Sequence, residues 1–177
     1  AVCHTAVRVP DEQGNDCPPG VAGGVLVRGE HVMVEYWNRP EATAETIVDG
    51  WLHTGDIAIM DEEGFVSIQD RIKDMIISGG ENVYPAEIEG VLSEHPGISE
   101  AAVIGQQSER WGESPLAIVV ATDENLKQAD VMEFCQGKLA RFKQPKAVEF
   151  VSAIPRNPSG KILKRVLRDQ FDKNAAD

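Results

Sequence analysis

The chain has 177 residues, of which 42% are hydrophobic and 26% charged, with a formal net charge of −12. This composition is typical of a folded soluble protein rather than a disordered one, and the negative charge argues against nucleic acid as the main partner. No apolar run approaches the roughly 18 residues of a membrane-spanning helix, and the first residues do not have the pattern of a secretory signal. The first residue is not Met, so we expect the chain to begin inside a longer protein.

Positive charge is concentrated near the C-terminus. Residues 138–168 hold nine basic residues and one acidic residue, whereas the rest of the chain holds eight basic and 28 acidic residues. This reversal suits a phosphate-rich ligand, and equally a solvated helix face lined by lysines. Three cysteines without CxxC spacing indicate reduced thiols of a cytoplasmic protein, and four scattered histidines predict no metal site.

Residues 1–70 contain mainly strand and turn patterns. The apolar run 23–29 predicts a strand, and the partly alternating run 31–37 is also strand-like. Residues 38–43 are expected to be a loop, with a helical turn at most over 41–46. Two strand-like runs on either side of Asp61–Gly64 predict a hairpin over residues 51–70.

From about residue 72 the pattern alternates between strands and helices. The predicted elements are a hairpin over 74–85, a helix from Pro85 to Pro96-Gly97, strands over 98–106 and 114–122, a helix within 129–140, a strand over 146–151 and a final helix capped by Ser159. The order β-β-α-β-β-α-β-α predicts a small α+β domain with a short sheet and about three helices.

The stretch RNPSGKILKR, residues 156–165, contains a Gly-Lys pair like that of a phosphate-binding loop. Such a loop needs a glycine five residues before the pair and Ser or Thr after it, but these positions hold Pro155 and Ile162. The pattern instead predicts a helix start with Lys161 in the first turn, where the helix dipole disfavours a lysine. This mismatch is a mild sign of function, although an ordinary surface lysine explains the pattern as well.

Two other polar segments have a functional and a structural interpretation. Asp56 ends a Thr-Gly-Asp turn, and its carboxylate could accept hydrogen bonds from two vicinal ribose hydroxyls or serve the turn alone. Arg71 and Lys73 alternate as in a strand, which would place both on one face. Arg71 could donate to a sugar or phosphate, or the pair could belong to a charged strand edge.

Six segments in register resemble the C-terminal portion of the AMP-forming acyl-CoA synthetases, in the adenylate-forming superfamily with firefly luciferase and peptide-synthetase adenylation domains. They are GGVLVRGEHVMVEYWNRPEAT, GWLHTGDIA, GFVSIQDRIKDMIISGGENVYPAEIE, AAVIGQQSERWGE, RFKQPKAVEFV and PRNPSGKILKR. The resemblance implies an α+β fold with two parts. Residues 1–71 would be the incomplete end, a β subdomain, of the large N-terminal adenylate-binding domain, and residues 72–177 the small, mobile C-terminal domain.

The resemblance implies roles for individual residues in the adenylation step. Asp56 and Arg71 match the residues that bind the ribose of ATP or AMP. Lys73 matches the hinge residue between the two domains. Lys161 matches the lysine that contacts carboxylate and α-phosphate oxygens, where its charge would offset negative charge that develops in the transition state.

A second set of residues is implied for CoA. Gly79 and Gly80 match a loop that approaches the pantetheine thiol after the C-terminal domain rotates. The region that receives the CoA nucleotide is matched by Trp111, which could stack on adenine, and by Lys143 and Lys146, which could meet the phosphates.

The family reaction has two half-reactions. A carboxylate attacks ATP to give an acyl-adenylate and pyrophosphate, and the CoA thiol then displaces AMP after rotation of the C-terminal domain. The implied ligands are ATP, CoA and a small-molecule carboxylic acid, with a place in fatty acid metabolism. Mg²⁺ is expected with ATP, but its ligands would lie outside this chain. Apolar surface on residues 1–70 would favour self-association into a homo-oligomer.

The chain departs from the family pattern at several points. Asp70 replaces a common glycine, and Gly24-Val25 stands where Gly-Glu is usual. The phosphate loop and the acyl pocket are absent, so we expect the chain alone to be inactive. The sequence leaves open a luciferase-like or carrier-protein-loading adenylating enzyme, and a non-enzymatic module that binds CoA or a partner protein.

Overall fold

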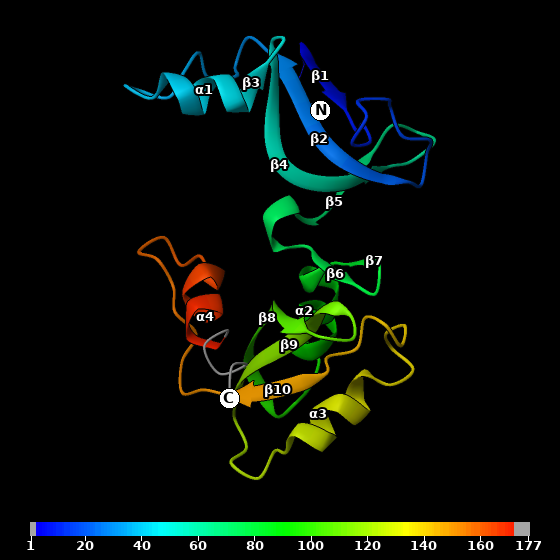
Figure 1. The fold of residues 1–177 in the computed structure, drawn as a ribbon, viewed down its shortest axis with the longest axis vertical. Coiled ribbons are helices and arrows are strands. Elements are labelled where there is room, and N and C mark those ends of the chain that lie inside the picture. The colour runs from blue at the N-terminus through cyan, green and yellow to red at the C-terminus, as the bar shows by residue number, and fades with distance from the viewer. Residues whose placement is uncertain (1–2, 172–177) are drawn as a thin grey trace. The chain divides into compact units, whose positions relative to one another are not determined.

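A computed structural model describes residues 3–171, which divide after Lys73 into an N-terminal unit and a C-terminal unit (Figure 1). The α+β fold class is confirmed, with two five-stranded sheets and four α-helices in the described residues. No helix among these residues is long and apolar enough to span a bilayer.

The N-terminal unit is an antiparallel sheet around one long central strand. Its strands are β1 (Thr5–Arg8), β2 (Ala22–Gly29), β3 (Ile47–Val48), β4 (Trp51–Met60) and β5 (Val66–Arg71). Strand β4 pairs with β2 along one edge, and β3 and β5 share its other edge. The hairpin predicted over residues 51–70 is confirmed. Its turn is fixed by the Asp61 carboxylate, which accepts hydrogen bonds from the backbone N–H groups of Glu63 and Phe65.

Two predictions for this unit are wrong. Residues 31–37 form turns rather than a strand, and two of their large side chains, Val34 and Trp37, are 90% and 84% exposed. Their alternation finds no partner strand, and an unpaired strand is not stable. The loop predicted over residues 38–43 runs into helix α1 (Pro40–Thr46), because the fixed φ of Pro40 suits the first helical turn.

The C-terminal unit has the predicted order of elements. Its strands are β6 (Ile76–Ser78), β7 (Glu81–Val83), β8 (Ile98–Ser108), β9 (Gly112–Ala121) and β10 (Ala147–Phe150), and its helices are α2 (Pro85–Ser93), α3 (Gln128–Cys135) and α4 (Lys164–Phe171). The sheet order is β10-β9-β6-β7, with β8 on β9, and β10 is the strand that runs parallel to its neighbour. A 3₁₀ turn, η1 (Ile72–Asp74), connects β5 to this unit.

Both faces of the second sheet are buried. Along β9, Ala117 and Val119 pack with α2 and α3, whereas Leu116 and Ile118 pack with Leu167 of α4. Strand β9 therefore has an almost continuous apolar sequence, as expected for a strand covered on both sides. The sheet is thus a rigid support for the loops at its ends.

Candidate functional site

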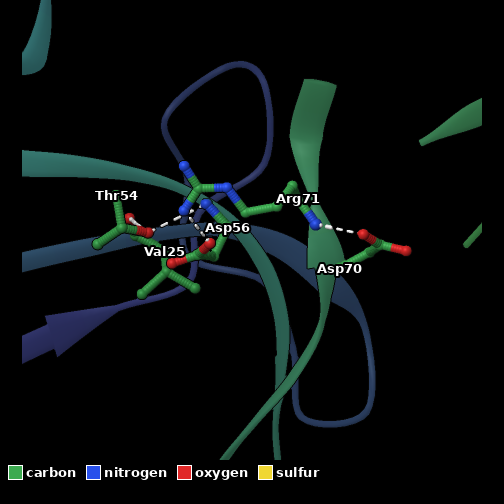
Figure 2. Close-up of polar contacts among 5 residues, drawn as sticks. All are labelled: Val25, Thr54, Asp56, Asp70 and Arg71. Atoms are coloured by element: carbon green, nitrogen blue, oxygen red, sulfur yellow. Dashed lines mark hydrogen bonds and ion pairs between the residues drawn. The ribbon is translucent and has the colours of Figure 1, made fainter. Parts of the chain in front are cut away.

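Asp56 lies at a bulge inside strand β4. The pairs Gly24–Ile57 and Leu26–His53 leave three residues of β4, Thr54 to Asp56, opposite Val25 alone. Gly55 has a φ of +74°, a left-handed conformation that glycine adopts without strain. The Thr54 hydroxyl donates to the Val25 carbonyl at 3.2 Å and accepts from the Asp56 N–H at 3.1 Å (Figure 2). The tight turn predicted here is therefore a bulge, which redirects the Asp56 side chain.

Arg71 is the cross-strand partner of Asp56. Its Nη1 donates to Asp56 Oδ1 at 2.6 Å, and its backbone N–H donates to Asp70 Oδ1 at 2.7 Å (Figure 2). The side chains of Asp56 and Arg71 are 25% and 40% exposed, so the pair is open to a ligand. Asp56 Oδ2 accepts no hydrogen bond from residues 3–171, and Arg71 Nε has no partner there either. The structure thus brings the two predicted ribose-binding residues together and leaves one carboxylate oxygen free.

Lys73 does not continue the strand that carries Arg71. Strand β5 ends at Arg71, and Lys73 lies on the 3₁₀ turn η1. The expectation that both side chains alternate along one strand is wrong, because a 3₁₀ turn rotates successive residues by about 120°. The division between the two units falls directly after Lys73. Its role as the hinge stays a prediction.

The glycine pair forms the tip of the β6–β7 hairpin. Gly79 and Gly80 have φ of +63° and +87°, and a two-residue turn with positive φ at both positions matches the strand twist. The Gly79 N–H donates to the Trp111 carbonyl at 2.8 Å. The Trp111 indole covers Gly79 so closely that a Cβ there would lie 2.9 Å from Trp111 Cε3.

A cavity of about 600 Å³ lies beside this hairpin. It is lined by Ser78, Gly79, Glu81, Arg110, Trp111, Arg141, Phe142 and Lys146. Three of the predicted CoA residues, Gly79, Trp111 and Lys146, therefore share one cavity. Gly80 and Lys143 are not part of its lining, and the Lys143 ammonium lies 2.7 Å from a carboxylate oxygen of Glu87 on α2.

Five residues of this cavity were not predicted individually: Ser78, Glu81, Arg110, Arg141 and Phe142. Arg110 places its guanidinium 4.6 Å from the centre of the Trp111 ring, a cation–π contact. Arg141 and Phe142 belong to the same short segment as Lys146, and the Lys146 ammonium donates to the Arg141 carbonyl at 3.0 Å. An arginine next to a predicted stacking tryptophan was a signal for Arg110. Arg141 and Phe142 lie in the segment RFKQPK, which the resemblance as a whole assigned to the CoA nucleotide, although neither residue was named individually.

Lys161 lies on a loop and not in the first turn of a helix. Helix α4 begins at Lys164, and the predicted cap, Ser159, donates to Asn157 Oδ1 at 2.8 Å instead. The same Asn157 oxygen accepts a hydrogen bond from the Lys161 N–H at 2.8 Å. The backbones of Arg156 and Ile162 form an isolated antiparallel β-bridge, which closes the loop. Ser159 does not cap the helix, because its hydroxyl and the Lys161 N–H both donate to the Asn157 side chain within this loop. The Lys161 side chain is exposed and makes no ion pair within residues 3–171.

Metal ligands are not grouped in the described part of the chain. No set of three or more His, Cys, Asp or Glu side chains in residues 3–171 is placed to hold a metal ion. We therefore assign no residue of this chain to the Mg²⁺ expected with ATP.

Comparisons with known proteins agree with this arrangement. Residues 87–161 match the model of the AMP-binding enzyme C-terminal domain. The chain is 56% identical over 149 residues to the long-chain-fatty-acid–CoA ligase FadD13 of Mycobacterium tuberculosis, covering 84% of this chain and 30% of that protein. It is 53% identical over 165 residues to the fatty acid–[acyl-carrier-protein] ligase ScoC of Streptomyces coeruleorubidus, covering 93% of this chain and 32% of that protein.

A solved structure shows the same likeness in three dimensions. ATP-bound MatB from Rhodopseudomonas palustris superposes with a TM-score of 0.90 at 41% identity, over 98% of this chain and 35% of MatB. The chain thus spans about a third of the length of the proteins it matches. Over nearly its whole length, the chain is similar to the C-terminal portion of AMP-forming acyl-CoA synthetases, and residues 87–161 match the C-terminal domain of AMP-binding enzymes.

Proposed function

We propose that this chain is the C-terminal portion of an ATP-dependent ligase that joins a carboxylic acid to CoA. The observation that carries this proposal is the cavity beside the glycine hairpin, in a chain 56% identical to a CoA ligase. The proposed domain assignment places residues 1–71 at the end of the adenylate-binding domain and residues 72–177 in the mobile domain.

The proposed adenylation step uses residues of both units. Asp56 Oδ2, held in place by the Arg71 pair to Oδ1, would accept hydrogen bonds from the ribose hydroxyls of ATP. The ammonium of Lys161, which makes no ion pair within residues 3–171, would neutralise charge on the carboxylate and α-phosphate oxygens as the acyl-adenylate forms. Bound Mg²⁺ would screen the phosphate charge.

The proposed acceptor is free CoA rather than a carrier protein. The cavity combines an indole with three cations, Arg110, Arg141 and Lys146, and this combination suits an adenine nucleotide with several phosphates. A carrier protein brings phosphopantetheine without the nucleotide, so the stacking surface and the cations would lack a partner. Carrier-protein loading is the second candidate, because ScoC, at 53% identity, is named as such a ligase.

The direct test uses the full-length ligase with ATP and a panel of carboxylic acids. Pyrophosphate exchange identifies the acid, and thioester formation is then compared between CoA, pantetheine and a phosphopantetheinyl carrier protein. We expect CoA to give the highest kcat/KM. A higher kcat/KM for the carrier protein would favour the second candidate, and no exchange with any acid would contradict the ligase proposal.

Variants of the cavity sharpen this test. Arg110→Ala and Arg141→Ala should each raise the KM for CoA roughly tenfold, the loss expected for one charge-assisted phosphate contact, and leave the KM for pantetheine unchanged. The control is Arg165→Ala, which removes an arginine whose side chain is 83% exposed and does not line the cavity. Equal effects on CoA and pantetheine would show that the cations do not bind the nucleotide.

A further inference from the structure

The carboxylate of Glu113 connects the two hairpins of the C-terminal unit. Strand β6 joins β9 through the single pair Ser78–Gly112. On one side of this pair, the Gly79 N–H donates to the Trp111 carbonyl at 2.8 Å. On the other side, the Ile77 N–H donates to Glu113 Oε2 at 3.0 Å. A side-chain oxygen thus takes the position that a main-chain carbonyl holds in a regular ladder.

Gly105 provides the surface on which this carboxylate rests. A Cβ at Gly105 would lie 3.3 Å from both Cδ and Oε1 of Glu113, and 3.4 Å from Oε2. Gly105 does not have a positive φ, so its backbone conformation does not require glycine. A Cβ at this position would instead press on the Glu113 carboxylate, which would have to shift by a few tenths of an ångström to make room. The carboxylate is therefore held between the bare backbone of β8 and the N–H of Ile77.

The hairpin held in this way forms one wall of the CoA cavity. Ile77 is two residues before Gly79, and Gly79 and Trp111 line the cavity together. The two hydrogen bonds on either side of Ser78 fix the position of the Gly79–Gly80 turn along β9. Without the Glu113 bond, the Gly79 hydrogen bond and the Ser78–Gly112 pair would remain between β6 and β9, while β6 would keep its pairing with β7.

We propose that Glu113 is a positioning residue for thioester formation. It holds the Gly79–Gly80 turn in register against β9, so that the turn presents its backbone to the incoming thiol. Glu113 itself does not line the cavity and does not touch the acceptor in this proposal. The inference rests on the proposed function, since it assigns the turn to the CoA half-reaction.

The test compares two substitutions in the full-length ligase. Glu113→Ala should slow thioester formation from preformed acyl-adenylate and CoA by roughly 10- to 100-fold, the range for losing a hydrogen bond to a charged group. Glu113→Gln should stay within about threefold of wild type, because its amide oxygen can accept from Ile77. Pyrophosphate exchange should be unchanged in both. Glu109→Ala, at an exposed glutamate four residues away, is the matched control for the loss of charge and should change neither reaction.

Two results would overturn the proposal. One is wild-type thioester formation in Glu113→Ala. The other is an equal loss in both half-reactions, because Lys161 lies in the same unit and general unfolding would reduce adenylation too. Gly105→Ala should crowd the carboxylate and cause a smaller loss of the same selectivity, and the double variant should be no worse than Glu113→Ala alone.

A second measurement separates this inference from the proposed function. If the wild-type ligase exchanges pyrophosphate but forms no CoA thioester, the proposed acceptor is wrong. The hydrogen bond from Ile77 to Glu113 is then tested separately, by amide hydrogen exchange in the 177-residue chain. Glu113→Ala should accelerate exchange at Ile77 and Gly79 roughly tenfold or more, whereas Glu113→Gln should not. Equal exchange rates in wild type and Glu113→Ala would show that Glu113 does not hold the β6–β7 hairpin.

Discussion

Replacing Gly79 with alanine would insert a methyl group against the indole that lines the proposed CoA cavity. The new Cβ would lie 2.9 Å from Trp111 Cε3 and 3.3 Å from Cζ3, closer than a stable contact allows. The φ of +63° adds about 1–2 kcal/mol of strain for any residue with a Cβ. Since Trp111 is 41% exposed, its ring can move away, so we expect the clash to displace the indole rather than unfold the unit.

Gly80 supplies the matched control for this substitution. It has a φ of +87°, and a Cβ there would have nothing within 4 Å. Gly80→Ala therefore carries the backbone strain without the clash. Both variants should lose about 1–2 kcal/mol of unfolding free energy in urea. Only Gly79→Ala should also weaken CoA binding, by about tenfold if the stacking contribution is lost.

The assay follows the indole and the ligand in the same protein. Trp37 and Trp51 are replaced by phenylalanine, which leaves Trp111 as the single tryptophan of the chain. Fluorescence should then shift to longer wavelength in Gly79→Ala and remain unchanged in Gly80→Ala, and calorimetry with CoA gives the two affinities. Identical spectra and identical CoA affinities in the two variants would refute the contact between Gly79 and Trp111 as a determinant of the cavity.

Three further outcomes are expected. In the full-length ligase, Lys161→Ala should lower adenylation about 10²- to 10³-fold but spare thioester formation from preformed adenylate, and equal losses would refute its role. Asp74→Ala removes a buried carboxylate 2.6 Å from its arginine partner on α4, and should cost roughly 1.5–3 kcal/mol in urea unfolding. Asp169→Ala breaks an exposed pair and should cost at most about 0.5 kcal/mol, so equal costs would contradict the burial argument. Burial raises the pKa of the Cys135 thiol, so at about pH 8 Ellman's reagent should label exposed Cys3 rapidly and Cys135 only after unfolding.

The sequence predicted those elements whose signals are local. The hairpin over residues 51–70 was readable because Asp61 and Gly64 fix its turn within a few residues. The order of elements in the C-terminal unit was readable because β9 is apolar from Pro115 to Ala121 and Pro85 marks a helix start. In both cases the hydrogen bonds that decide the structure lie near each other in the chain.

The predictions that were wrong depend on competing or distant partners. Ser159 and Asn157 both suit a cap, and only the folded loop shows that Asn157 takes the hydrogen bonds. The bulge at Asp56 requires the register with Val25, 31 residues earlier. The cavity unites Arg110 with Arg141, which no spacing rule connects. The family resemblance therefore supplied the candidate site residues, whereas their geometry depends on strand pairing between distant parts of the chain, which local pattern does not reveal.

The C-terminal unit carries its two proposed reactive loops at opposite ends of the same strand pair. The glycine turn is held at the start of β9, where Ser78 pairs with Gly112. The Lys161 loop is tied through Arg156 to Glu100, which pairs with Val120 near the end of β9. These two points of β9 are roughly 25 Å apart at the rise of an extended strand. A sheet packed on both faces cannot bend to bring the loops together. We therefore expect a single-site mechanism in which the unit turns between the half-reactions, so that each loop reaches the acyl carbon in its own step.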